Sequence, residues 1–168
     1  IGQEALYTAT TASDNTAIGF QSLYYNTSGA SGVAVGWNAL FNNTTGASNT
    51  GIGYQALTAN TTGTQNVAIG AYALDANTAA DDLVAVGYTA LTTYNRSGGG
   101  DAKTVGIGNA AFHDLTTGTQ NTAVGHQAGY SQTSVNDAAF FGFKAGYNTS
   151  TGAQNTAIGS QALLANTT

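Results

Sequence analysis

Residues Asn49 to Gln65, N-T-G-I-G-Y-Q-A-L-T-A-N-T-T-G-T-Q, contain one complete copy of a 17-residue unit that runs through the whole chain. Each copy is marked by a glycine that follows an aliphatic residue, or Phe in one copy. A fixed period of this kind determines the architecture of the whole chain. The marker glycines are Gly2, Gly19, Gly36, Gly53, Gly70, Gly87, Gly108, Gly125, Gly142 and Gly159.

The unit is too short for a helical repeat, which needs about 33 to 47 residues. Pairs of β-branched residues two positions apart, such as Val33 and Val35, follow the period of a short strand. Glycine and the N-T-T-G strings indicate corners, because Gly and Asn tolerate the positive φ of tight turns. The sequence therefore predicts an all-β fold, a parallel β-solenoid of about ten 17-residue coils, with equivalent residues about 4.8 Å apart.

Stacked coils place equivalent residues in columns, and the apolar columns are the expected core. One is the aliphatic column before the marker glycine: Ile18, Val35, Ile52, Ile69, Val86, Ile107, Val124 and Ile158. Another is the leucine column, Leu23, Leu40, Leu57, Leu74, Leu91 and Leu163, beside an alanine column that includes Ala39 and Ala56. An asparagine ladder, with amides bonded from coil to coil, is expected at Asn26, Asn43, Asn60, Asn77 and Asn166.

The interval between Gly87 and Gly108 is four residues longer than the others. The extra residues lie within Arg96 to Lys103, R-S-G-G-G-D-A-K, which predicts a loop inserted around 96–103. Otherwise residues 1–168 form a single repetitive segment, which we expect to be a fragment of a longer chain because it begins within the pattern.

The amino-acid composition of the chain excludes several classes of function. Only 7% of the residues are charged and the net charge is −5, with three cations, Arg96, Lys103 and Lys144, so we expect no nucleic-acid partner. The chain has no cysteine, and no apolar stretch approaches the roughly 18 residues of a membrane span, so membrane insertion within the segment is not expected. No catalytic set, cofactor motif or metal-ligand spacing stands out, and we expect no enzyme activity, cofactor or metal.

Two further columns are candidate surfaces. An aromatic column follows the marker glycine at Phe20, Trp37, Tyr54, Tyr88 and Phe143, and it is expected either to bind a ligand or to pack in an interface. Threonine ranks that include Thr27, Thr44 and Thr61 fit either turn chemistry or an ice- or surface-binding face. One coil buries little apolar surface for 17 ordered residues, which favours association of chains. The small alanines that include Ala17 and Ala34 are expected at that interface.

The N-T-A-I-G strings at Asn15 and Asn155, with N-V-A-I-G at Asn66 and N-T-A-V-G at Asn121, resemble the head repeats of trimeric autotransporter adhesins. The longer phrase I-G-Y-Q-A-L-T-A-N-T-T-G, beginning at Ile52, resembles the repeats of phage tail-fibre proteins still more closely. The resemblance covers essentially every coil. It implies a left-handed β-roll and a homotrimer that meets a host or another surface.

These observations predict a non-enzymatic structural and adhesive segment of a trimeric fibre, from a phage tail fibre or a bacterial surface adhesin. Such a segment acts as a rigid shaft or head and as a receptor-binding surface, with a cell-surface glycan or protein as the partner. The expected location is extracellular, on a cell surface or on a virion. An ice- or surface-binding solenoid and a purely architectural extracellular filament are the alternatives.

Overall fold

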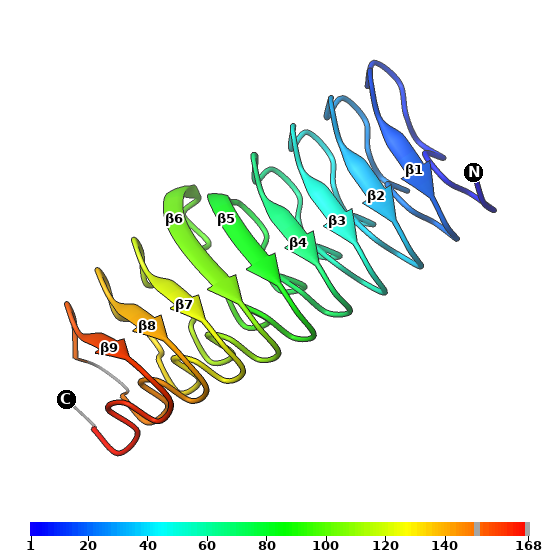
Figure 1. Ribbon diagram of the computed structural model, residues 1–168. Coiled ribbons are helices and arrows are strands. Elements are labelled where there is room, and N and C mark those ends of the chain that lie inside the picture. Colours follow the sequence, from blue (N-terminus) through cyan, green and yellow to red (C-terminus); the bar gives the residue numbers. More distant parts are fainter. Residues whose placement is uncertain (150–151, 167–168) are drawn as a thin grey trace.

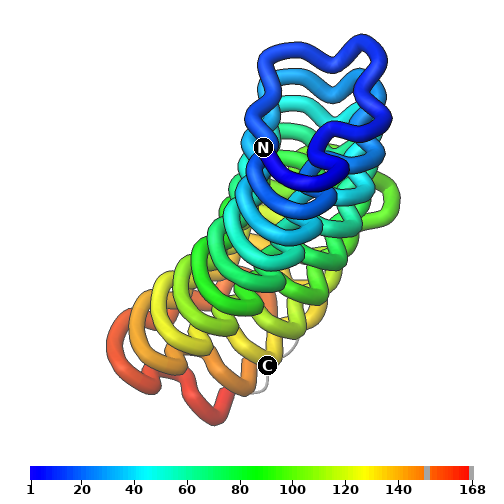
Figure 2. Tube along the Cα trace, turned by 90° about the vertical axis from the view of Figure 1, so that its right-hand side faces the viewer, coloured from blue at the N-terminus to red at the C-terminus, as the bar shows by residue number. Residues whose placement is uncertain are grey.

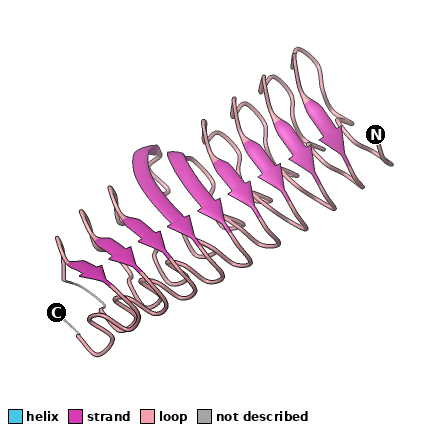
Figure 3. Ribbon diagram, in the orientation of Figure 1, coloured by secondary structure: helices cyan, strands magenta, loops and turns pink. Residues whose placement is uncertain are grey.

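The structure, a computed structural model that describes residues 1–149 and 152–166, is a rod of stacked coils with its termini at opposite ends (Figures 1 and 2). Nine strands form one parallel sheet in sequence order, which gives about eight full turns. The strands are β1 (Thr16–Ile18), β2 (Val33–Val35), β3 (Thr50–Ile52), β4 (Val67–Ile69), β5 (Ala80–Val86), β6 (Gly100–Ile107), β7 (Thr122–Val124), β8 (Ala139–Phe141) and β9 (Thr156–Ile158). Turns and loops connect them (Figure 3).

The predicted 17-residue register is confirmed. Thr16 of β1 pairs with Val33 of β2, and Val33 pairs with Thr50 of β3. The same offset relates every neighbouring pair of strands except β5 and β6. Residues 17 apart in the sequence therefore lie side by side, and each surface of the rod consists of columns of equivalent side chains.

The marker glycines hold the corner that follows each strand. At Gly53 φ is +138°, and an added Cβ would lie 2.5 Å from the carbonyl oxygen of Gly70 in the next coil. A side chain at this position therefore meets two obstacles, an unfavourable backbone conformation and a neighbouring backbone that cannot move without disturbing its own coil. This is why the column after the aliphatic residue is glycine in every copy of the repeat.

The interior of the rod is narrow and consists of leucine and alanine. Leu40, Leu57, Leu74 and Leu91 are fully buried, as are the neighbouring alanines Ala39, Ala56, Ala73 and Ala90. In six strands the inward residue between the two outward ones is also a buried alanine: Ala17, Ala34, Ala68, Ala85, Ala123 and Ala157. These alanines are therefore core residues, and the prediction that they lie at an interface between chains is wrong.

The prediction of an inward aliphatic column is wrong as well. Ile18, Ile52, Ile69 and Ile107 are 36 to 41% exposed, Ile158 is 74% exposed, and Val35, Val86 and Val124 are half-buried. Successive side chains on a strand point to opposite faces, so burying the alanine places both of its neighbours outside. The leucines leave no room for a larger inward residue: even at Gly51 an added Cβ would lie 3.2 Å from Leu40 Cγ. Leu163, in the coil after β9, is 39% exposed.

The four extra residues of the long coil are absorbed in two places. Gly100 pairs with Ala80, at an offset of 20, whereas Thr104 pairs with Leu83, at an offset of 21, and the shift occurs at an irregularity between Asp81 and Leu83. Most of the insertion forms a turn before β6, which projects beyond the neighbouring coils as the green lobe in Figure 2. The insertion also lengthens β5 and β6, to 7 and 8 residues.

Candidate interaction surfaces

Apart from the extensions of β5 and β6, which carry Asp81, Asp82, Asp101 and Lys103, the outward face of the sheet is uncharged. Each three-residue strand presents its first and third residues, as Val33 and Val35 do in β2 and Val67 and Ile69 do in β4. Thr occupies the first position in β1, β3, β7 and β9, and Ile, Val or Phe occupies the third position throughout. We call this surface, made of the first and third residues of the three-residue strands with Val84, Val86, Val105 and Ile107, the strand face.

The aromatic column runs along the edge of the strand face, and its rings stack on one another. The ring centroids of Phe20 and Trp37 are 6.2 Å apart with the planes 11° from parallel. Those of Trp37 and Tyr54 are 4.9 Å apart at 7°. Farther along the rod, Tyr88 meets the edge of Tyr72, and Phe143 stacks on His126 at 5.5 Å. Trp37, Tyr54, Tyr88 and Phe143 are 40 to 53% exposed, and Phe20 is half-buried.

The stacking decides what this column can do. A sugar packs against the flat face of a ring, and both faces of Trp37 are covered by Phe20 and Tyr54. The column therefore fits the packing alternative, either within the rod or against another chain, better than a row of sugar-stacking platforms.

A second aromatic column lies five residues after the marker glycine. Tyr24 stacks on Tyr7 at 5.1 Å and on Phe41 at 5.2 Å, and Tyr25 meets both Tyr24 and Phe41 edge-on. In the last coils the same column holds His113, Tyr130 and Tyr147, with centroids 4.7 and 5.1 Å apart. Its 17-residue spacing is visible in the sequence, but interruption by Thr58, Asp75 and Thr92 obscures it.

The asparagine column forms a buried ladder. Nδ2 of Asn43 donates to Oδ1 of Asn26 (2.9 Å), Asn60 donates to Asn43 (2.8 Å), and Asn77 donates to Asn60 (3.1 Å). Asn166 lies in the last coil and is half-buried. A second asparagine column, which was not predicted, runs parallel to it. There the Oδ1 atoms of Asn49 and Asn66 accept from the backbone N–H of the next coil at 3.0 Å.

The threonine rank after the asparagine ladder also bonds from coil to coil. Thr27 Oγ1 donates to the carbonyl oxygen of Thr44 (3.0 Å), Thr44 to that of Thr61 (3.0 Å), and Thr61 to that of Thr78 (2.9 Å). Each hydroxyl proton is therefore used by the backbone, which is the turn chemistry expected of these residues. The methyl groups and the oxygen lone pairs are what remains for a ligand.

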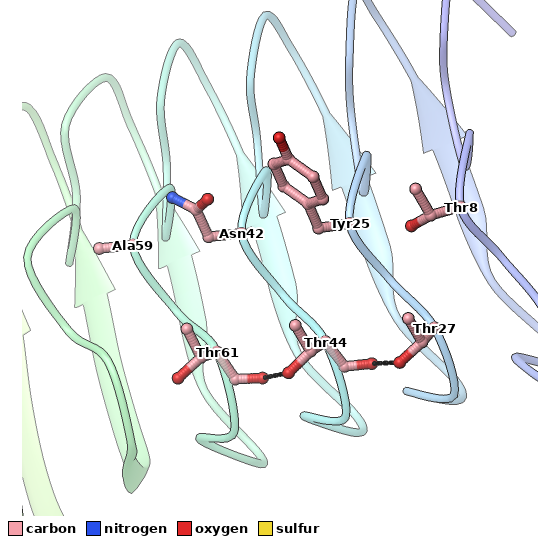
Figure 4. Close-up of a pocket in the computed structure, with 7 residues that line it drawn as sticks. All are labelled: Thr8, Tyr25, Thr27, Asn42, Thr44, Ala59 and Thr61. Carbon is pink, nitrogen blue, oxygen red and sulfur yellow. Dashed lines mark hydrogen bonds between the residues drawn. The ribbon is translucent and has the colours of Figure 1, made fainter.

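A groove with a volume of about 400 Å³ runs along the rod beside this rank (Figure 4). One wall is the rank itself, Thr27, Thr44 and Thr61, and the other is formed by Thr8, Tyr25, Asn42 and Ala59. The residue between the two walls in each coil is a buried ladder asparagine, such as Asn26 or Asn43, which turns inward and leaves the hollow above it. None of the lining residues belongs to a strand.

The charged residues are concentrated around the long coil. Asp101 forms an ion pair with Lys103 at 3.1 Å, and Asp81 Oδ1 accepts from the backbone N–H (2.6 Å) and hydroxyl (3.0 Å) of Thr64. Among the described residues, no three or more His, Asp or Glu side chains gather as a metal site would require. Burial raises the pKa of Tyr94, whose hydroxyl donates to the carbonyl oxygen of Gly118, to about 12.

Within residues 1–149 and 152–166 we find no helix with the length and apolar character needed to cross a bilayer. Searches against protein-family models, curated proteins and solved structures found no match to the chain.

Proposed function

We propose that this chain is a non-enzymatic segment of an extracellular fibre, on a phage tail or a bacterial surface, in which identical chains associate through their strand faces, most simply as a homotrimer. The segment acts as a rigid shaft or head and carries a receptor-binding surface. The observation that carries this proposal is the outward aliphatic column, with Ile18, Ile52, Ile69 and Ile107 each more than a third exposed in the single chain.

A continuous apolar stripe of this kind is unusual on an isolated soluble chain and is typical of an interface. Nine strands about 4.8 Å apart, each three residues of about 3.3 Å, give a strand face of roughly 400 Å² in projection. A stable interface buries about 800 Å² on each partner, so the columns beside the strand face must take part. A closed ring, in which every chain contacts two neighbours, buries the strand face together with the aromatic column, and a trimer is the smallest such ring.

The mass of the native particle tests this proposal. One chain has a mass of 16.8 kDa, and we expect light scattering to give three times that mass. Replacing Ile52 and Ile69 with Glu places two charges in the proposed interface and should release single chains, because an unpaired buried charge is costly. The matched control, Thr45→Glu with Thr62→Glu, adds the same charges at exposed corner positions and should remain a trimer.

A wild-type mass of one chain would overturn the proposal. In that case thermal hysteresis would test the ice-binding alternative, which requires a monomer with a free flat face. If the Ile52→Glu, Ile69→Glu variant keeps the trimer mass, the strand face is not the contact between chains.

A further inference from the structure

We propose that the groove between the threonine rank and Tyr25 binds a neutral, hydroxyl-rich oligosaccharide that lies along the rod axis. This inference rests on the proposed adhesive function and identifies the surface and the class of receptor. It moves the binding site away from the aromatic column, where Phe20 and Tyr54 cover both faces of Trp37, to a wall of the rod that contains no strand residue.

The groove offers mostly hydrogen-bond acceptors. Every backbone N–H of residues 25–27, 42–44 and 59–61 donates to a carbonyl oxygen of the protein. The hydroxyls of Thr27, Thr44 and Thr61 also donate within the protein. The lone pairs of these hydroxyl oxygens remain free to accept a hydrogen bond from a ligand, and each coil contributes one such threonine. A ligand must therefore bring its own donors, in a row that follows the coils.

The opposite wall supplies an apolar surface and a few polar atoms. The Tyr25 side chain projects from it beside Asn42 (Figure 4), and Tyr25 is 44% exposed. Asn42 donates one N–H to the carbonyl oxygen of Thr58 (2.9 Å), which leaves Oδ1 and the second N–H for a ligand. With the threonine methyl groups and Ala59, these side chains make a mostly apolar hollow with a few polar positions, the usual composition of a binding site for a small molecule.

The lack of charge and the excess of hydrogen-bond acceptors in the groove favour a neutral sugar over an anionic ligand or an extended peptide. No lining residue is charged and the chain carries a net charge of −5, so an anionic ligand would find neither a cation nor enough donors. An extended peptide presents carbonyl oxygens as often as N–H groups, and those carbonyls would face threonine oxygens with no proton to give. Sugar hydroxyls both donate and accept, and the pyranose C–H face packs on aromatic and methyl groups.

The experiment is a binding assay of the purified 168-residue chain on immobilised hexasaccharides. The neutral set contains linear glucans, mannans, galactans and chito-oligosaccharides, and the comparison set contains a hyaluronan hexasaccharide and a (Gly-Ser)5 peptide. We expect binding to at least one neutral hexasaccharide and to neither comparison probe. Tyr25→Ala should weaken that binding about tenfold, through loss of its stacking surface.

Two threonine variants make the test specific to the groove. Thr44→Val keeps the methyl shape but removes the acceptor, and should weaken binding about fivefold, the cost of one hydrogen bond. Thr116→Val is the matched control, because Thr116 makes the same bond, to the Thr133 carbonyl oxygen at 2.7 Å, in the same rank but outside the groove. Both variants lose one hydroxyl hydrogen bond to the next coil, but only Thr44→Val removes an acceptor that lines the groove.

Failure to bind any neutral hexasaccharide, preference for the hyaluronan or the peptide, or equal binding by Tyr25→Ala and the wild type would overturn the inference. Because the mass of the trimer is measured separately, a trimer that binds no sugar would contradict this inference but not the fibre proposal. A monomer that binds sugar in the groove would do the reverse.

Discussion

The coils from β1 to β4 and those from β7 to β9 share one backbone and one register but fill their interiors differently. In the first region every coil buries a leucine, and the inward strand residue is alanine or glycine. In the second region the leucine column changes to Phe112, Gly129 and Gly146, and the inward residue of β8 is Phe140.

The aromatic rings occupy the space that the missing leucines leave. An added Cβ at Gly146 would lie 2.5 Å from Phe140 Cδ1, and one at Gly129 would lie 2.5 Å from Phe112 Cε1. The two rings themselves meet edge-on at 6.0 Å. The repeat therefore does not preserve the residue at each inward position. It preserves the total side-chain volume that neighbouring coils together place in the interior.

The asparagine ladder differs between the same regions. After Asn77 its column continues as Tyr94, Leu115, Gln132 and Thr149. Gln132 is fully buried, and neither polar atom of its amide has a partner among the described residues. The side chain is one methylene longer than asparagine, so its amide does not bond to the carbonyl oxygen three residues ahead, as Asn43 does to that of Gly46. The last coils therefore lack part of the polar ladder that the first coils have.

The largest effect should come from removing a ring. Phe140→Ala empties the space beside Gly129 and Gly146, two positions of the leucine column that carry no side chain, so we expect a loss of about 3 to 5 kcal/mol in stability toward denaturant. Ala34→Gly, at the same inward position in β2, is the control and should cost about 1 kcal/mol. A loss of similar size in both variants would mean that Phe140 has no special packing role.

The same substitution in the asparagine column should have opposite effects in the two regions. Asn60→Leu leaves Asn43 Oδ1 and Asn77 Nδ2 without their ladder partner and should cost about 2 to 4 kcal/mol. Gln132→Leu removes an unpartnered buried amide next to Leu115 in the column, and should be neutral or stabilising by about 1 kcal/mol. Chemical denaturation of both variants measures the contrast, and an equal loss in the two would contradict it.

A double replacement gives the interior of the coils near β8 the leucine and alanine packing of the coils from β1 to β4. Gly146→Leu alone should destabilise, because its side chain meets Phe140, but with Phe140→Ala it restores the regular leucine and alanine pair. We expect the double variant to be about 2 kcal/mol more stable than the sum of the single effects. The backbone allows this leucine, since φ is +64° at Gly146 and +52° at Leu40. If Gly129→Leu replaces Gly146→Leu in the double variant, the gain in stability over the sum of the single effects should be smaller, because Phe112 still blocks position 129.

The smallest effect concerns Asp75, between the two regions. Burial raises the pKa of this carboxyl, although the hydrogen bond from Thr92 Oγ1 (2.6 Å) opposes the shift. The folded state therefore favours the protonated form, and this stabilisation is lost as the pH rises through the raised pKa. Asp75→Asn should raise the melting temperature at about pH 7 and leave it unchanged at about pH 3. Asp137→Asn, at an exposed position, should change neither value.

Periodicity alone predicted the main features of the rod. The 17-residue interval gave the register, the leucine column of the core, the hydrogen-bonded asparagines and the place of the insertion. The aromatic column was also predicted, but not that Phe20, Trp37 and Tyr54 stack face to face and so cover one another. The groove was not predicted, because it depends on an inward asparagine between two outward columns, and the pattern alone does not say which turn residues point inward.

The sequence by itself determined that residues 17 apart lie side by side, because a fixed period leaves a chain of short strands and glycine corners no other regular arrangement. Only the tertiary structure decided which side of each strand faces inward. Both Ala and Ile are apolar, so hydrophobicity favours the larger residue for the core. The leucines from the opposite wall already fill the narrow interior. Phe140, the large residue at the middle of the three-residue strand β8, lies where glycine replaces those leucines.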